Sequence, residues 1–170
     1  MKRLTKEFIS QSIIRLDEYT KKIDRCLMDI SGQEIWERPN ESSNSVGNLI
    51  LHLCGNITQY IISALGNIED KRERDEEFKA SGGYTRNELV QKLTDIVAQA
   101  KDIIIHLDTE ELLMIRSVQG FKLSGLGIVL HVVEHLSYHT GQIAFWIKLL
   151  RNKDLGFYDD FDLNQKNILD

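Results

Sequence analysis

Apolar residues recur every three or four positions along four long segments of the chain, with polar residues between them. This spacing places the apolar side chains on one face of an α-helix. It predicts helices over residues 4–30, 43–65, 85–107 and 124–150. Helices of this kind bury their apolar faces best against one another. We therefore expect an all-α fold, a four-helix bundle that occupies residues 1–170 as a single domain.

The stretches between the predicted helices are polar or irregular. Residues 68–84 are heavily charged, and we expect a solvated connection there, with any helical turn extending the second helix. Within it, the run 70–79 mixes both signs of charge, which is typical of an exposed surface. Residues 115–123 are less periodic and predict a short hairpin or an irregular crossing. The tail over residues 151–170 is polar with scattered aromatic residues, and we expect it to pack loosely over the bundle.

Composition limits the classes of function. The formal net charge is -5 and no cluster of basic residues occurs, which argues against nucleic acids and anionic membranes as partners. No apolar run reaches the roughly 18 residues that a membrane span needs, and the N-terminus lacks the apolar stretch of a secretory signal. The two cysteines, Cys26 and Cys54, form no Cys-x-x-Cys motif. They are typical of reduced thiols in a cytoplasmic protein.

Two histidines of the fourth predicted helix form a candidate metal-binding pair. His135 and His139 are four residues apart, so they lie one turn apart on nearly the same face of a helix. Zinc proteases use this spacing in the H-E-x-x-H motif, but the pair here lacks that glutamate, which removes the general base of a protease. His131 lies one turn earlier, and we expect it to pack beside the pair or support it rather than to be a ligand.

His52 is the candidate third ligand. It belongs to a polar line along the second predicted helix, whose other members are Ser45, Asn48, Asn56, Gln59 and Ser63. If the polar margins of the two helices face each other, His52 joins the pair, and three nitrogens are enough for a metal site with open positions. The alternatives are a solvated His52, a pair that arose by chance, and a bundle that binds no metal. Cys54 points away from His52 and is expected in the core.

Two short motifs carry a resemblance to a known family. They are Ser-Val-Gly-Asn-Leu-Ile-Leu-His-Leu at residues 45–53 and Glu-His-Leu-Ser-Tyr-His-Thr-Gly-Gln-Ile at residues 134–143. Together with the chain length and helix order, they resemble the DinB/YfiT-like metalloprotein superfamily. The resemblance implies a four-helix bundle that holds a divalent metal through one histidine of the second helix and an H-x-x-x-H pair of a later helix. Carried over, the metal ligands are His52, His135 and His139.

One position departs from the family pattern. Thr140 stands where many relatives have an arginine before the Gly-Gln dipeptide. The departure leaves the three ligands in place, but it gives no support for an anion contact that relatives share at this position.

The resemblance also implies what the site does. Some relatives resemble thiol S-transferases that use a low-molecular-weight thiol such as bacillithiol or mycothiol, others resemble metal-dependent hydrolases, and relatives are often dimeric. We expect a cytoplasmic homodimer that activates a thiol or water on zinc, nickel, iron or manganese and attacks a small electrophile. The alternative is a non-catalytic metal-binding protein with a stress-related or interaction role. The residues that we expect to contact the substrate or support the ligands are Gln142, Asn56 and, less well oriented, Tyr138.

Overall fold

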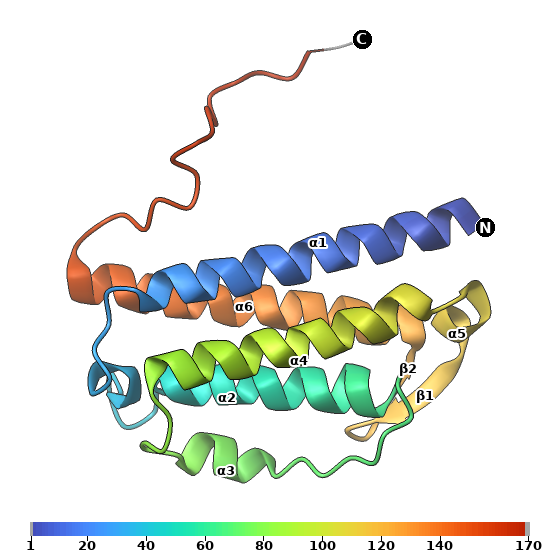
Figure 1. Ribbon diagram of the computed structural model, residues 1–170, viewed down its shortest axis with the longest axis horizontal. Helices are drawn as coiled ribbons and strands as arrows, with labels where there is room; N and C mark the ends of the chain where they lie inside the picture. The colour runs from blue at the N-terminus through green and yellow to red at the C-terminus, as the bar shows by residue number, and fades with distance from the viewer. Residues whose placement is uncertain (1, 169–170) are drawn as a thin grey trace.

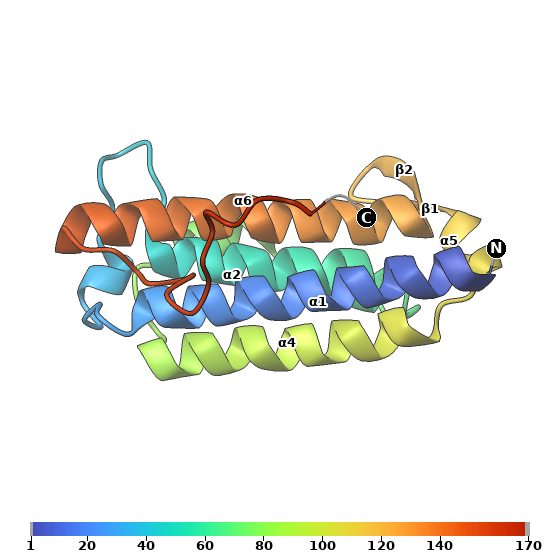
Figure 2. The same ribbon diagram turned by 90° about the horizontal axis from the view of Figure 1, so that it is seen from above.

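Four long helices form the body of the molecule, and they lie side by side in both ribbon views (Figures 1 and 2). They are α1 (Lys2–Leu27), α2 (Val46–Ile57), α4 (Arg86–His106) and α6 (Gly125–Arg151). The computed structural model describes residues 2–168. Both α1 and α2 pack against α4 and α6. The predicted four-helix bundle is therefore confirmed.

The apolar faces of these helices meet in one continuous core. It includes Leu16, Leu53, Leu93 and Leu136, each at most 1% exposed. Each of the four helices thus contributes one of these side chains, as the apolar periodicity predicts. None of the helices within residues 2–168 is both long and apolar enough to cross a membrane.

The second helix departs most from its predicted bounds. It begins at Val46, after Ser45, whose side chain accepts a hydrogen bond from the backbone N–H of Asn48. After Ile57 the chain continues as a π-helical turn, η2 (Thr58–Ser63), instead of as regular α-helix. Such turns are rare and often occur at functional sites. The apolar spacing does not reveal them, because the chain stays helical.

A two-stranded hairpin closes one end of the bundle (Figure 1). After α5 (Thr109–Leu113), strand β1 (Ile115–Val118) pairs antiparallel with β2 (Phe121–Ser124). The two loop residues, Gln119 and Gly120, have φ angles of 50° and 83°. Positive φ at both positions is typical of the two-residue turns that join antiparallel strands. Of the two predictions for residues 115–123, the hairpin is correct.

The charged connection after η2 does not extend α2. Instead it forms a separate short helix, α3 (Arg74–Lys79), which packs against α2 (Figure 1). A 3₁₀ turn, η1 (Glu34–Trp36), lies between α1 and α2 along the chain.

The tail after α6 contacts α1 over its first residues. Leu155 is buried, and the Tyr158 hydroxyl accepts a hydrogen bond of 2.8 Å from Lys22. Residues 159–168 are exposed; Asp159 still pairs with Arg25 of α1 at 3.3 Å, and the end of the tail leads away from the helices (Figure 1).

Candidate metal centre

Three histidines converge between α2 and α6. His52 comes from the middle of α2, and His135 and His139 come from successive turns of α6. The Nε2 atom of His135 lies 3.1 Å from Nε2 of His52 and 3.2 Å from Nε2 of His139. One ring nitrogen of each histidine lies within 4.8 Å of the others. The structure therefore brings together the three side chains that the sequence predicts as ligands.

The spacing and protonation of these rings fit a shared metal ion. Two nitrogens bound to one tetrahedral zinc ion at about 2.0–2.1 Å are about 3.3 Å apart, which is close to the separations found around His135. Burial and the neighbouring imidazoles lower the pKa of His135 to about 3, and burial lowers the pKa of His139. Near neutral pH both rings are thus uncharged, and the neutral ring is the form that binds a metal.

The second ring nitrogen of His52 has a carboxylate partner. Its Nδ1 lies 3.0 Å from Oε2 of Glu77, so Nδ1–H donates to the carboxylate and Nε2 keeps its lone pair toward His135. Arg72 donates to the two oxygens of Glu77 at 2.7 and 2.8 Å. Burial opposes ionisation of Glu77, but the hydrogen bonds from Arg72 and His52 outweigh it and lower the pKa. A charged carboxylate behind a histidine is a common way to fix the tautomer of a ligand.

Most of the run 70–79 is exposed, as predicted, but the Arg72–Glu77 pair is a correction to that prediction. The two side chains are only 4% and 11% exposed. They lie over Gly55 of α2, where an added Cβ would meet Oε1 of Glu77 at 1.9 Å. Sequence reasoning missed this pair. Gly55, a second glycine within the 12 residues of α2, is the signal that could have pointed to a close approach.

The polar line of α2 holds this segment in place. The side-chain amide of Asn48 donates to the backbone carbonyl oxygens of Glu77 and Ala80 at 2.9 and 2.7 Å. One turn beyond Asn56, the side-chain oxygen of Gln59 accepts a hydrogen bond of 2.9 Å from Arg72. The line therefore serves mainly to dock α3 and the chain before it against His52.

The ring of His139, a candidate ligand, is supported by an amide oxygen instead of a carboxylate. Its Nδ1 lies 2.7 Å from Oε1 of Gln142, so the ring N–H donates to the amide oxygen and Nε2 keeps its lone pair. Gln142 is one of the residues predicted to support the site, and the structure places it behind a candidate ligand. The Nδ1 atom of His135 is buried and has no hydrogen-bond partner among the described residues.

The remaining candidates lie beside the cluster. The ring of His131 stacks on Tyr60 of the π-helical turn with centroids 4.3 Å apart, and its Nε2 is 3.3 Å from the amide nitrogen of Asn56. Among residues 2–168, Asn56 therefore forms its hydrogen bond with His131 and not with one of the three candidate ligands. Tyr138 is 63% exposed and meets the ring of His139 edge-on at 5.0 Å.

Three further side chains form no hydrogen bond with the histidines among residues 2–168. The Thr140 hydroxyl is buried and donates to the carbonyl oxygen of Leu136 at 2.7 Å, inside its own helix. Both cysteines are buried and free. Burial raises the pKa of Cys54 to about 12 and that of Cys26 to about 11, so neither offers a thiolate near neutral pH.

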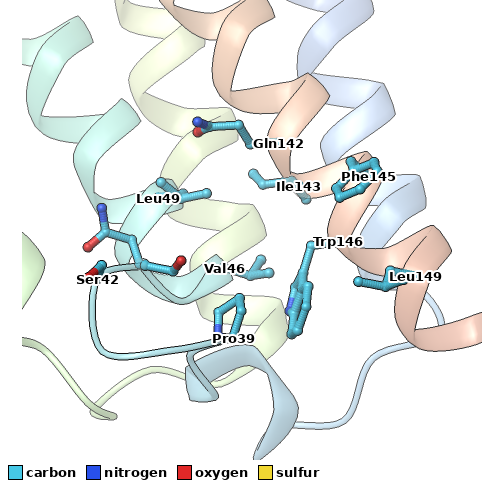
Figure 3. Close-up of a pocket in the computed structure, with 11 residues that line it drawn as sticks. Pro39, Ser42, Val46, Leu49, Gln142, Ile143, Phe145, Trp146 and Leu149 are labelled. Atoms are coloured by element: carbon cyan, nitrogen blue, oxygen red, sulfur yellow. The ribbon is translucent and has the colours of Figure 1, made fainter.

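A cavity of about 480 Å³ lies next to the histidines, between α2, α6 and the loop before α2. We call it the α2–α6 cavity. Figure 3 shows Gln142 at one end of it and Pro39 with Trp146 at the other. Because Gln142 also contacts His139, the cavity reaches the edge of the candidate metal centre.

The chain resembles known families and structures over most of its length. A family model described as "Protein of unknown function (DUF1572)" matches residues 3–158. No curated protein matches the chain. A crystal structure of a conserved protein from Enterococcus faecalis is 17% identical, with a TM-score of 0.72 over 85% of this chain and 97% of the other.

Two DinB-like proteins have similar crystal structures. The one from Bacillus cereus is 11% identical, with a TM-score of 0.67 over 87% of this chain and 93% of the other. The one from Bacillus subtilis, YjoA, is 15% identical, with a TM-score of 0.65 over 85% of this chain and 94% of the other. At such low identity the likeness shows a shared fold.

Proposed function

The chain belongs to the DUF1572 family, a DinB-like family of proteins of unknown function, and we propose its activity from the geometry of its own site. The proposed activity is a metal-dependent transfer of a small thiol to a small electrophile. The observation that carries this proposal is the convergence of three imidazole nitrogens from His52, His135 and His139. A divalent transition metal held by three neutral imidazoles supplies Lewis acidity and affinity for a soft thiolate or for water.

The net reaction is a substitution. The thiol sulfur supplies the electron pair of a new C–S bond, the bond from that carbon to its leaving group breaks, and the leaving group departs with the bonding pair. The thiol proton passes to the solvent. A thiol needs little help to ionise, because its pKa is about 8.5.

The surroundings of the histidines favour a thiol over water as the nucleophile. Water attack usually relies on a general base within hydrogen-bond reach. Glu77 is the carboxylate that contacts the cluster, and both of its oxygens are already engaged by His52 and Arg72. Among residues 2–168, no other carboxylate forms a hydrogen bond with the three histidines. A hydrolase with water in the place of the thiol is therefore the second choice.

The chain's own residues have assignable tasks in this scheme. Glu77 and Gln142 each accept the N–H of a ligand ring, which keeps the lone pairs of His52 and His139 directed at one point. The α2–α6 cavity offers space beside that point for the electrophile.

The first experiment is elemental analysis of untagged protein purified without chelators or nickel resin. We expect about one equivalent of a transition metal per chain. The loaded protein is then assayed with 1-chloro-2,4-dinitrobenzene and either bacillithiol or L-cysteine, and chloride release with formation of the thioether is followed by absorbance. Bound metal without any turnover would overturn the enzyme proposal and leave a metal-binding role. Absence of metal, even after reconstitution, would overturn the site itself.

A further inference from the structure

The α2–α6 cavity lies between the same two helices that carry the histidines and meets the candidate metal centre at Gln142. Leu49 lines the cavity three residues before His52 on α2, and Ile143 lines it four residues after His139 on α6. Each of these two residues is thus about one helical turn from a candidate ligand. A molecule in the cavity would reach the metal centre past Gln142, which belongs to both.

The walls of the cavity carry no charged side chain. The residues that line the cavity include no aspartate, glutamate, lysine or arginine. The walls come from apolar and aromatic side chains, with hydroxyl and amide groups of residues 42–44 at one side; the apolar set is Val46, Leu49, Ile143, Phe145, Trp146 and Leu149. A volume of about 480 Å³ lies within the range of small-molecule sites.

A second cavity near the centre provides a contrast. It has a volume of about 570 Å³ and lies behind α2, where Glu69, Lys71, Arg72, Glu73 and Lys92 are among its lining residues. Charged groups thus gather on one side of the centre and are missing from the walls of the other cavity. A carboxylate or phosphate held against the walls of the α2–α6 cavity would lose its hydration without gaining a cationic side chain as a partner, which is costly.

From this adjacency and this lining we infer that the α2–α6 cavity binds an uncharged aromatic ring of the substrate, with the electrophilic end toward Gln142 and His139. That the bound molecule is a substrate rests on the proposed function. The selection for an uncharged ring rests on the cavity alone, so the two are tested separately.

The test uses the side-chain N–H signals of the two tryptophans in nitrogen-15-labelled protein. Trp146 lines the cavity, whereas Trp36 lies outside it and donates to the carbonyl oxygen of Tyr84. A Trp36→Phe variant assigns the two signals. The protein is titrated with 4-nitrobenzyl alcohol, which is neutral, and with 4-nitrobenzoate, which has similar size and carries a charge.

We expect 4-nitrobenzyl alcohol to shift the Trp146 signal to saturation while the Trp36 signal stays in place, and 4-nitrobenzoate to bind at least about tenfold more weakly. Leu149→Glu introduces a charge at a cavity position that is 62% exposed, and it should weaken binding of the alcohol by about tenfold. Leu130→Glu is the control, because Leu130 is 45% exposed on the same helix and outside the cavity.

Metal-stripped protein separates this inference from the proposed function. Binding of the alcohol to stripped protein, with no thiol transfer by the loaded protein, would support the cavity and overturn the activity. Thiol transfer without a Trp146 shift would overturn the cavity and leave the activity standing. Equal binding of the two probes, or equal loss in Leu149→Glu and Leu130→Glu, would overturn the selection for an uncharged ring.

Discussion

The two helices that form the centre support their histidines in different ways. On α6, His135 and His139 owe their proximity to their spacing within one helix, and Gln142, three residues after His139, supports the ring from the same helix. On α2, His52 depends on Glu77, which lies 25 positions later and is itself held by Arg72. One half of the centre is therefore local in sequence, and the other half is assembled by tertiary packing.

This difference has an energetic consequence. A pair fixed within one helix remains in place whenever α6 is folded. The tautomer and orientation of His52 are fixed only while the segment that carries Glu77 is docked against α2. Side-chain hydrogen bonds of Asn48 and Gln59 hold that segment in place. We expect changes at the docked segment to affect metal affinity more than comparable changes around Gln142.

The largest effect should come from the ligand shared by both halves. Nε2 of His135 is the atom closest to both other histidines, so His135→Ala should reduce metal content from about one equivalent to near zero. Elemental analysis after gel filtration measures this. His131→Gln is the control, since His131 stacks on Tyr60 and lies outside the ligand set. Metal loss in His131→Gln would mean that the set includes a fourth histidine.

The next largest loss of metal affinity should come from a change that acts on the His52 half of the centre alone. Glu77→Gln removes the charged acceptor behind His52, and we expect metal affinity to fall by about 10–100-fold, the usual cost of losing such a partner. Competition with a chromophoric chelator measures the affinity. Glu76→Gln is the matched control, because its side chain is 62% exposed and pairs with Lys79 at the surface. Equal losses in the two variants would show that Glu77 acts through overall charge and not through His52.

The same contrast explains what could be predicted from the sequence. The four helices follow from apolar spacing, and His135 with His139 follows from a separation of four residues. His52 follows from its place on a polar line and from the family resemblance. The burial of Arg72 and Glu77 could not be predicted this way, because a mixed charged run has the same composition whether it is solvated or docked.

A smaller effect should follow from filling the space under Glu77. Gly55→Ala would place a Cβ 1.9 Å from Oε1 of Glu77, so the Arg72–Glu77 pair must shift. Crowding of this kind typically costs about 1–3 kcal/mol of unfolding free energy, which the roughly 1 kcal/mol gain in helix propensity offsets in part, and the displaced carboxylate should also lower metal affinity. Denaturant unfolding of metal-free protein and chelator competition measure the two effects. Unchanged metal affinity in a destabilised variant would argue that Glu77 does not orient His52.

The smallest effect should come from the equivalent change on the local half of the centre. Gly141 of α6 lies between His139 and Gln142, and an added Cβ would meet no atom of residues 2–168 within 4 Å. Gly141→Ala should therefore stabilise the helix by up to about 1 kcal/mol, because glycine has low helix propensity. Metal affinity should stay at the wild-type value, since the hydrogen bond from His139 to Gln142 keeps its geometry. The same two measurements test this variant, and a loss of affinity equal to that of Gly55→Ala would remove the distinction between the two halves.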